Sequence, residues 1–393
     1  MLQGLRNTRE LLYDSGKGLP LSVIPDLLGR ALFTLYLEDR KILSRDGYPD
    51  TTPESVDSFF DVLEYKQATY DLFDKLKEKF NGDLFPISTE ERRGVNREHL
   101  REVRKCFFGF NHKRAMMPLW KMFDFQYIPI ELISAIYEEF MSGEEDGKLR
   151  TRTEGAFYTK PMLVEFMLNE VLPLPDKANK KYDLKILDPS CGSGIFLVQC
   201  YKRLISRWKF SNPEKTLDAD VLEGILIGSI FGIDKDTEAI KVAAFSLYLT
   251  FLNYLEPVEI RSKYLEHKRK KFKPLVYWTN RKEVNERHRA NQEMGRNLFQ
   301  CNTFDDQGFR NIKFDLIIGN PPWRHGTATD QVVSSFIRSK GLPSQIACAY
   351  LSYIPSMLAN NGVIALVCTA KILFNTSTIF EKFRSSLFTT YNV

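Results

Sequence analysis

The tetrapeptide Asn320-Pro321-Pro322-Trp323 combines side chains that can hold an aromatic amine. It follows the apolar run 314–318, which is typical of a buried strand. The Asn320 side-chain oxygen can accept a hydrogen bond from an amino group, and the two prolines stiffen the loop and have no N–H. Trp323 offers a flat face on which a planar base can stack. The group suits a nucleobase amine, and a strand followed by a proline turn is the structural alternative.

A glycine-rich turn lies upstream, in the segment Asp188-Pro189-Ser190-Cys191-Gly192-Ser193-Gly194. An apolar strand precedes this turn, and a helix is expected over 196–208. Glycines allow a ligand to approach the backbone closely, and the helix N-terminus presents free N–H groups. The dinucleotide fingerprint is not met, because its third glycine is missing. The turn therefore predicts a ligand site of another kind.

The next strand, expected over 230–233, ends in Asp234. A carboxylate at the tip of the second strand is placed to accept hydrogen bonds from two ribose hydroxyls. Asp236 is expected to cap a helix over 237–249. Each of these features alone is weak evidence, but the order of glycine turn, acidic strand end and Asn-Pro-Pro-Trp is specific.

With these motifs in this order, the chain resembles the S-adenosylmethionine-dependent N6-adenine DNA methyltransferases of the gamma arrangement. More narrowly, it is similar to the methylase part of type I and type IIG restriction–modification and related phage-defence enzymes. The segments that carry the resemblance are 155–159 (Gly-Ala-Phe-Tyr-Thr), 188–194, 232–234 and 320–323, with further support from 136–140 and 361–367. The motifs are tightest from residue 136 to about residue 375.

The resemblance implies that S-adenosylmethionine is the cofactor. Tyr158 and Thr159 would hold its methionine end. The alternative for Tyr158 is an aromatic side chain that only packs in the protein core. Asp188 would meet the amino group of the methionine moiety, directly or through water, and Asp234 would bind the ribose. The stem of Lys235 would cover the adenine face.

Four further residues of the turn are assigned to the cofactor site: Pro189, Cys191, Gly192 and Gly194. Phe196 either lines the pocket or begins the core of the following helix. Lys160 stands where relatives commonly have proline, so this loop is expected to differ slightly.

The motif after the third strand departs from the family pattern. Asn302 stands where relatives usually have aspartate, which accepts from the adenine amino group of the cofactor, and Thr303 follows. An amide oxygen lacks a full charge, so this hydrogen bond should be weaker by about 1 kcal/mol. Asp305 and Asp306 are nearby substitutes.

The family resemblance also gives the catalytic residues. The target adenine would be flipped out of the duplex, and Trp323 would stack on it. The Asn320 oxygen and the Pro321 carbonyl would accept its two amino hydrogens, with Pro322 keeping the loop rigid. No metal is required, and cytosine C5 methylation is excluded because the chain has no Pro-Cys dipeptide.

Alternating strands and helices after residue 183 predict an α/β fold with a doubly wound, mostly parallel, Rossmann-like sheet. Strands are expected at 184–187, 230–233, 298–301, 314–318 and 362–368, and the resemblance implies the order 3-2-1-4-5. The last strands of the family's sheet, a sixth and an antiparallel seventh, are expected to be missing. The catalytic domain would cover 151–393.

Residues 1–150 are expected to form an α-helical domain. Apolar residues recur at helical spacing over 19–43 and 55–80, a third helix is expected over 130–141, and 142–152 reads as a linker. The pair Pro49-Asp50 followed by Glu64-Tyr65-Lys66 matches a loose nuclease pattern whose carboxylates would bind Mg²⁺. Such carboxylates belong at strand ends, so a helical face is the favoured reading.

The net charge of +5 (55 basic minus 50 acidic residues) is mild for a nucleic-acid binder, so a local basic surface would have to contact DNA. The run 267–273 is the densest, but such runs are usually solvated helical faces. Arg324 and His325 follow the catalytic loop and are better candidates, and 326–335 could form a mobile substrate loop.

The six cysteines show no metal-ligand spacing, and most lie in apolar runs, which predicts reduced, buried thiols in a cytoplasmic protein. The chain has neither a membrane-spanning run nor a secretion signal.

Double-stranded DNA is the expected partner. A second polypeptide, or a missing C-terminal target-recognition domain, is expected to complete the enzyme. This predicts weak or no methylation by the chain alone, and an open apolar sheet edge near 314–318 or 363–367. Two alternatives stay open: a methyltransferase acting on protein or RNA amino groups, and a non-catalytic DNA-binding subunit.

Overall fold

The computed structural model divides the chain into two compact units: Met1–Met141 with Leu252–Pro274, and Ser142–Phe251 with Leu275–Val393. The residues described are 2–14, 18–21, 23–80, 87–109, 124–127, 144–145, 148–149, 159–266, 272–278, 295–305, 309, 311–323 and 330–393. Each unit has its own core, and each is considered by itself.

The first unit is helical over its described residues. Its helices are α1 (Leu2–Asp14), α2 (Val23–Asp39), α3 (Phe59–Val62), α4 (Lys66–Lys79), α5 (Thr89–Gly94), α6 (Arg97–Phe108) and α13 (Pro257–Ile260), followed by a π-helical turn, Arg261–Glu266. The segment 252–274 joins this unit because the Arg40 guanidinium donates to the carbonyls of Leu252 and Leu255 at 2.7 and 3.1 Å. The expected helix over 130–141 lies outside the described residues, and so does Asn81, which follows the helical pattern over 55–80.

The expected continuous helix over 55–80 is wrong, because the chain breaks between α3 and α4. Tyr65 is extended, with φ −121° and ψ 98°. The carbonyls of Val62 and Tyr65 still accept backbone N–H groups at the break, and the Thr69 hydroxyl lies within hydrogen-bond distance of both, at 2.9 and 3.0 Å. A helical repeat of apolar residues does not report such a break, since Phe59, Leu63 and Phe73 are buried on either side of it.

Glu64, the glutamate of the nuclease-like pattern, lies at this break and pairs with Arg97 and Arg101 at 3.0 and 2.9 Å. Both arginines lie on α6, so the carboxylate joins two helices. Among the described residues no group of three His, Cys, Asp or Glu side chains could hold a metal ion. The expected position of Glu64 on a helical face is wrong, because this residue lies in the turn between α3 and α4, and Lys66 begins α4. Neither residue lies at the strand end that the nuclease chemistry would need.

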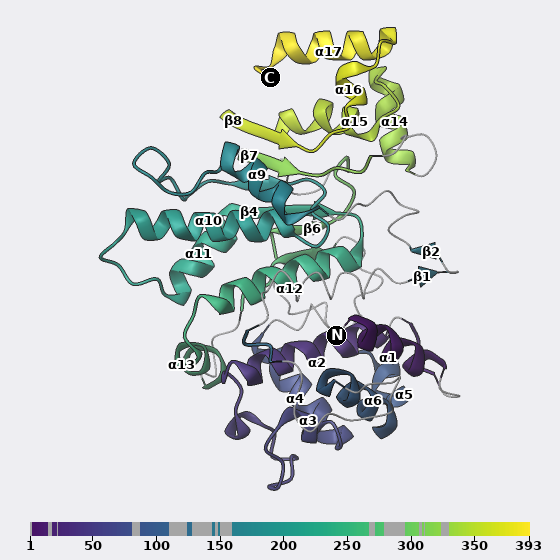
Figure 1. Ribbon diagram of the computed structural model, residues 1–393, viewed down its shortest axis with the longest axis vertical. Coiled ribbons are helices and arrows are strands. Elements are labelled where there is room, and N and C mark those ends of the chain that lie inside the picture. The colour runs from purple at the N-terminus through teal and green to yellow at the C-terminus, as the bar shows by residue number, and fades with distance from the viewer. Residues whose placement is uncertain are drawn as a thin grey trace. The chain divides into compact units, whose positions relative to one another are not determined.

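The second unit is built on a six-stranded parallel sheet with the order β5-β6-β4-β3-β7-β8 (Figure 1). Its strands are β5 (Val276–Trp278), β6 (Leu298–Gln300), β4 (Ile230–Asp234), β3 (Ile186–Asp188), β7 (Phe314–Gly319) and β8 (Leu358–Leu366). The expected order 3-2-1-4-5 is confirmed, and β5 is an additional edge strand that the sequence pattern did not indicate. A separate antiparallel pair joins β1 (Glu144–Glu145) and β2 (Lys148–Leu149).

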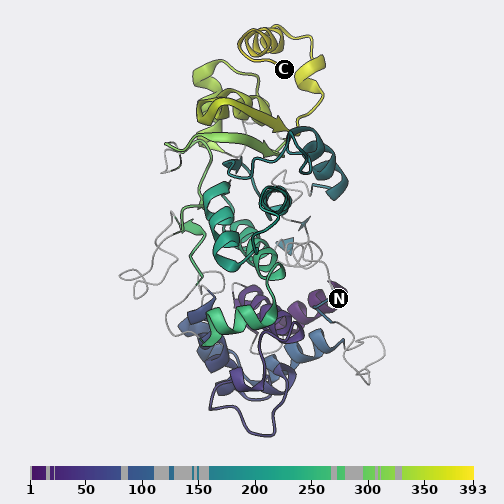
Figure 2. The same cartoon turned by 90° about the vertical axis from the view of Figure 1, so that its left-hand side faces the viewer.

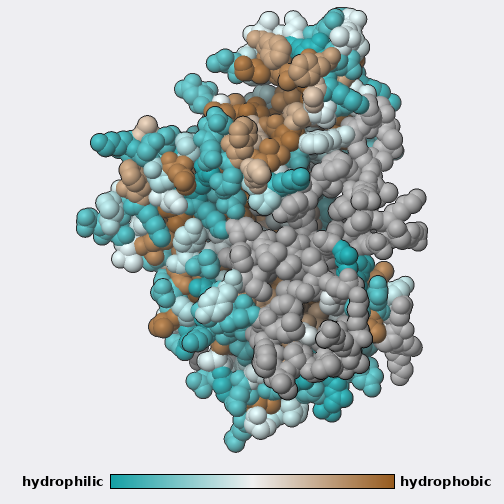
Figure 3. Space-filling model, viewed as in Figure 1, coloured by the Kyte–Doolittle hydropathy of each residue, from teal (hydrophilic) through white to brown (hydrophobic). Residues whose placement is uncertain are grey.

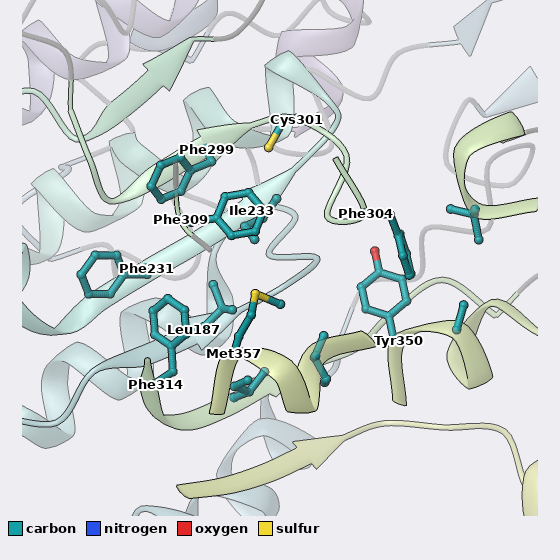
Figure 4. Packing of buried hydrophobic residues seen from close by; sticks show 14 of the residues in the cluster. Leu187, Phe231, Ile233, Phe299, Cys301, Phe304, Phe309, Phe314, Tyr350 and Met357 are labelled. Atoms are coloured by element: carbon teal, nitrogen blue, oxygen red, sulfur yellow. The ribbon is translucent and has the colours of Figure 1, made fainter. Parts of the chain in front are cut away.

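Helices cover both faces of this sheet. On one face, Gly232 of β4 leaves room for α10 (Ile195–Ser211), since a Cβ added there would lie 2.7 Å from Leu197. On the other face, Phe231 and Ile233 pack with α14 (Gln331–Lys340), α15 (Ile346–Tyr353) and the turn Ile354–Met357. Figures 1 and 2 show α14 and α15 beside β7 and β8, and Figure 4 shows the aromatic core between them and the strands. The fold is a doubly wound α/β sheet, as the alternation of elements predicts.

The remaining helices of this unit are α9 (Pro161–Val171), α11 (Ala219–Ser229), α12 (Thr237–Asn253), α16 (Lys371–Phe374) and α17 (Thr378–Thr390). The expected helices over 196–208 and 237–249 are both present, each slightly longer than its sequence pattern. Asp236 caps α12 as expected, since its carboxylate accepts the backbone N–H of Glu238 at 2.8 Å. Every described helix is too short or too polar to cross a membrane.

The expected open edge at 314–318 is wrong, because β7 pairs with β3 on one side and with β8 on the other. Among the described strands, β8 pairs with β7 alone, and Val363 on it is 45% exposed. Figure 3 shows apolar side chains gathered over α9 and around α17, and these include Met162, Phe166 and Phe388. That another chain covers the β8 edge stays a prediction.

All six cysteines are free thiols, and five of them are buried. This agrees with the expectation from their apolar surroundings. Burial raises the pKa of the Cys106 thiol to about 11, which leaves it protonated and unreactive at neutral pH.

Candidate active site

The candidate residues converge at the carboxyl ends of β3, β4, β6 and β7. Because these four strands are parallel neighbours, their ends meet at one edge of the sheet. Asp188 and Asp234 are the last residues of β3 and β4, and Asn320 directly follows β7. Asn302 lies two residues beyond β6. Residues that lie as far apart as 188 and 320 in the sequence are thus brought to the same end of the sheet.

The glycine turn and Asp234 are joined directly. The Gly192 N–H donates to one Asp234 carboxylate oxygen at 2.9 Å, and the Asp236 N–H donates to the other at 2.9 Å. The Cys191 N–H donates to the Ile233 carbonyl at 2.9 Å. The expected juxtaposition of the turn with the acidic strand end is therefore observed, and Asp234 also has a structural task in holding the turn.

The two glycines of the turn serve different purposes. Gly192 has φ +52° and a Cβ added to it would meet nothing within 4 Å, so the turn faces open space there. Gly194 has φ +84°, and its Cβ would lie 3.0 Å from that of Ala243 on α12. Gly192 thus leaves room for a ligand, whereas Gly194 allows helix α10 to begin tightly against α12.

Asp188 is a buried carboxyl group, 1% exposed. Burial, and secondarily the nearby Asp234, raise its pKa to about 8, and its hydrogen bond from the Ser190 N–H at 3.0 Å only partly offsets this. Burial likewise raises the pKa of Asp234 to about 6. Among the described residues Asp188 has no ion-pair partner, whereas the nearby Lys235 partly offsets the rise in the pKa of Asp234. A positively charged or hydrogen-bond-donating ligand would therefore stabilise the ionised form of Asp188 above all.

Gly319, the last residue of β7, allows that strand to end beside Asp188. A Cβ added to Gly319 would lie 2.4 Å from the nearer carboxyl oxygen of Asp188. The same close approach brings Asn320 next to the turn between β3 and α10. Gly319 was not among the predicted site residues, although a glycine between a buried strand and Asn320 is a signal for such a close approach.

The Asn320 side chain is held in one orientation. Its Nδ2–H donates to the hydroxyl oxygen of Thr159 at 3.1 Å, while its Oδ1 is buried and accepts no hydrogen bond. Thr159 is itself buried, 9% exposed, just before α9. A buried carbonyl oxygen without a donor costs about 1–3 kcal/mol, so this acceptor is suited to an incoming N–H group.

The rest of the tetrapeptide becomes more exposed along the chain. Pro321 is buried and Pro322 is half-buried, whereas Trp323 is 39% exposed. The indole N–H of Trp323 donates to the Val367 carbonyl at 3.3 Å, just beyond β8. The ring is therefore anchored at its polar edge and still reaches the surface.

Asn302 has both ends of its side chain engaged. Its oxygen accepts the Phe304 N–H at 3.1 Å, and its Nδ2–H donates to the carboxylate of Asp330 at 2.8 Å. Asp330 also caps α14 through the N–H groups of Val332 and Val333. A carboxylate is thus present beside position 302, but it comes from Asp330 rather than from Asp305 or Asp306, of which Asp306 lies outside the described residues.

The distance along the chain explains why Asp330 was missed. It follows the catalytic loop by several residues, and no local pattern links it to Asn302. An aspartate at position 302 would face the Asp330 carboxylate and be repelled by it. The departure from the family pattern is therefore consistent with this pairing.

Other predicted cofactor residues are partly committed to the fold. The Thr303 hydroxyl donates to the Pro189 carbonyl at 2.5 Å and lies 3.4 Å from the Tyr350 hydroxyl. Phe196 is 2% exposed, which favours the helix-core reading. Cys191 is buried, and burial raises its pKa well above the usual value.

Lys235 is exposed beside the site, and its carbonyl accepts from Gln300 at 2.9 Å. Tyr158, Arg324, His325 and residues 267–271 of the basic run lie outside the described residues.

Two family models match the chain. The N-6 DNA Methylase model matches residues 129–278, and the Eco57I restriction-modification methylase model matches residues 228–393. Together they span the glycine turn, the acidic strand end and the catalytic tetrapeptide. The N-6 DNA Methylase model also covers residues 130–141, where a helix is expected.

Two curated relatives are 24% identical to the chain. The type II methyltransferase M.BstVI of Geobacillus stearothermophilus aligns over 230 residues, 57% of this chain and 35% of its own length. The type II restriction enzyme and methyltransferase RM.Eco57I of Escherichia coli aligns over 330 residues, 77% of this chain and 30% of its own length. The chain thus spans about a third of the length of these relatives.

Among solved structures, the type IIL restriction-modification enzyme MmeI in complex with DNA has a TM-score of 0.58 at 16% identity. The match covers 98% of this chain and 52% of MmeI, and at this identity it supports the fold. The sequence matches agree with the sheet order and the motifs: over residues 129–393 the chain is similar to N-6 DNA methylases and to the methylases of restriction–modification systems.

Proposed function

We propose that this chain transfers a methyl group from S-adenosylmethionine to the N6 amino group of adenine in DNA. The observation that carries the proposal is the buried, unpaired Oδ1 of Asn320, which Gly319 brings beside the Asp188 turn. An acceptor without a donor, next to the buried Asp188 carboxyl group, fits an amine substrate and a cationic cofactor.

The residues present fit S-adenosylmethionine. The buried Asp188 carboxyl, with its raised pKa, suits the ammonium of the methionine moiety. The open space at Gly192 leaves room above the turn, and Asp234 can accept further hydrogen bonds, from ribose hydroxyls, beyond its two backbone donors. Bound there, the cofactor would supply an electrophilic methyl group on a sulfonium. Lys235, Asn302 and Tyr158 stay assigned to the same site by resemblance.

The chain's own groups would then act on the substrate amine. The Asn320 Oδ1 and the Pro321 carbonyl would accept its two hydrogens, which localises the nitrogen lone pair for attack on the methyl carbon. Formation of the N–C bond would break the bond between the methyl carbon and sulfur, leaving the cofactor as a neutral thioether, and the amine would release one proton to solvent. Most of the acceleration would come from positioning and from these fixed dipoles.

Adenine in a duplex must leave the stack before its amino group can reach Asn320. Unstacking costs a few kcal/mol, and stacking on an aromatic ring returns about 1–3 kcal/mol per base. Trp323 reaches the surface next to Asn320 and is suited to this task. Double-stranded DNA is therefore the proposed partner, and a second chain or further domain would choose the sequence.

The test begins with calorimetric titration of the chain with S-adenosylmethionine. Binding is expected for the wild type and for Asn320→Ala. Labelled cofactor is then incubated with stoichiometric protein and either unmethylated DNA, RNA or a release-factor protein, and the products are hydrolysed and identified by mass spectrometry. N6-methyladenine in DNA is expected from the wild type and should be lost in Asn320→Ala.

Asn179→Ala is the matched control, because Asn179 lies in an exposed turn of the same unit and bonds only locally to Asp176. It should leave both binding and methylation unchanged. Absence of cofactor binding would refute the proposal in favour of a non-catalytic subunit. Methylated glutamine or RNA without methylated DNA would move the site to another substrate.

A further inference from the structure

The hydrogen bond between Thr159 and Asn320 joins two motifs that are 161 residues apart. By resemblance, Thr159 was expected to hold the methionine end of the cofactor. In the structure its hydroxyl oxygen instead accepts the Asn320 Nδ2–H at 3.1 Å. This contact gives Thr159 a second possible task, which is to orient the amide of the catalytic asparagine.

Thr159 is well placed for this task because the element that follows it is fixed. Lys160 is the N-cap of α9, and Pro161 stands in the first turn of that helix. On the same helix, Glu165 and Asn169 accept hydrogen bonds from the Arg203 guanidinium of α10 at 2.6 and 2.7 Å. The Thr159 hydroxyl is thus held by a helix that is tied to the glycine-turn helix.

The orientation matters because the two ends of an amide have opposite hydrogen-bonding character. With Nδ2 committed to Thr159, Oδ1 is the end left without a partner in the site. Rotation of the amide by half a turn would place N–H donors there, and these would repel the hydrogens of an amine. The Thr159 hydroxyl, which accepts from Nδ2 here, can also donate to Oδ1, so the contact fixes the position and plane of the amide, and the hydrogens of an amine in the site then favour the orientation in which Oδ1 faces them.

We propose that Thr159 is a positioning residue, whose hydroxyl keeps the Asn320 Oδ1 directed at the substrate amine. The inference rests on the proposed function and deepens it. A positioning residue and a cofactor-binding residue differ in the quantity that their loss changes. If Thr159 positions Asn320, loss of its hydroxyl should slow methyl transfer and leave cofactor affinity nearly unchanged. A cofactor contact would do the reverse.

The decisive variants are Thr159→Val, which keeps the shape and removes the hydroxyl, and Thr159→Ser, which keeps the hydroxyl. Single-turnover methylation at saturating S-adenosylmethionine should fall at least tenfold in Thr159→Val and recover to within about threefold in Thr159→Ser. Cofactor affinity by calorimetry should stay within about twofold in both. Thr389→Val on the exposed face of α17 is the matched control and should change neither quantity.

A tenfold weaker cofactor affinity in Thr159→Val, with an unchanged rate at saturation, would overturn the inference. The proposed function fails if the wild type binds no S-adenosylmethionine. If the wild type binds the cofactor but methylates no substrate by itself, a double-mutant cycle on thermal unfolding still decides whether the contact exists. Thr159→Val should lower the unfolding midpoint in the wild-type background and have a smaller effect in the Asn320→Ala background. Equal effects in the two backgrounds would show that Thr159 does not hold Asn320. If Thr159→Val does not fold, Thr159→Ala takes its place in the cycle.

Discussion

The pKa of Asp188 makes a quantitative prediction about the pH dependence of cofactor binding. Burial, with a smaller contribution from Asp234, raises this pKa to about 8. If the ionised carboxylate binds the ammonium of S-adenosylmethionine, the protein must release a proton before or during binding below pH 8. Affinity should therefore rise with pH over the range in which Asp188 is mostly protonated.

The size of the effect follows from the two carboxyl groups. With a pKa of about 8, the ionised fraction of Asp188 rises from about 1% at pH 6 to about 9% at pH 7, so affinity should increase about tenfold. Asp234, with a pKa of about 6, rises from about 50% to about 90% ionised and adds less than a factor of two. The ligand's own amino group, with a typical pKa of about 7.7–8.0, stays mostly protonated in this range.

Calorimetric titration between pH 6 and pH 7 measures this directly. Repeating the titration in buffers of different ionisation enthalpy gives the number of protons released, which should be close to one at pH 6.5. In Asp188→Asn the affinity should be lower, and its pH dependence should shrink to the small contribution of Asp234. An affinity that is flat between pH 6 and pH 7, or a tenfold rise that persists in Asp188→Asn, would refute the reasoning.

The same pKa predicts how stability depends on pH in the absence of ligand. Because the folded pKa lies above the unfolded value of about 3.9, the folded state keeps the Asp188 proton when the unfolded state has lost it. The Asp188 contribution to stability is therefore fully present below about pH 4 and is lost as pH rises to about 8. Thermal unfolding at pH 5 and pH 7 should show a smaller decline for Asp188→Asn than for the wild type.

Three further predictions test the contacts that build the two units. Gly319→Ala places a Cβ 2.4 Å from the nearer carboxyl oxygen of Asp188. We expect it to lower the free energy of urea unfolding by about 1–3 kcal/mol and to weaken cofactor binding at least tenfold. Wild-type values for both would show that β7 can shift to make room. Asn302→Asp should lower the free energy of urea unfolding by about 1.5–3 kcal/mol, because it replaces the donor to the Asp330 carboxylate with a like charge. The double variant Asn302→Asp with Asp330→Asn should recover most of this loss. If it does not, the hydrogen bond between the two side chains is not the cause of the loss. Glu91→Gln removes the carboxylate that pairs with the buried Arg30 in the helical unit. It should lower the free energy of unfolding by about 3–5 kcal/mol, measured by thermal unfolding with circular dichroism. A loss below 1 kcal/mol would contradict this.

Much of the parallel sheet could be predicted because its signals are local. Apolar runs that end in a glycine turn, in Asp234 and in Asn320 mark three strands, and the alternation with helices fixes a parallel arrangement. The strand β5 was not predicted because it lies in a charged insertion, where alternation does not stand out. The start of β8 was not predicted because a register shift opposite 314–316, with Asn361 at φ +61°, lets the strand begin before the apolar run.

The contacts within the site could not be predicted in the same way. Thr159 and Asn320, and likewise Asn302 and Asp330, meet only after the sheet has formed. No periodicity or spacing connects such pairs, since their positions depend on the register of strands and on the loops between them. The residue types pointed to the right chemistry, whereas the hydrogen-bond partners emerged from tertiary structure.

Two buried polar atoms at this edge of the sheet have no hydrogen-bond partner among the described residues, the Asn320 Oδ1 and the Ser190 Oγ. Similar atoms occur elsewhere, such as the hydroxyls of Thr8 and Thr52, but these two lie in short segments that Gly319 brings together. Asp188 lies between them, accepts the Ser190 N–H, and has its pKa raised by burial. Each unpaired buried group costs about 1–3 kcal/mol. A cation and an amine bound at this edge would supply partners for these groups.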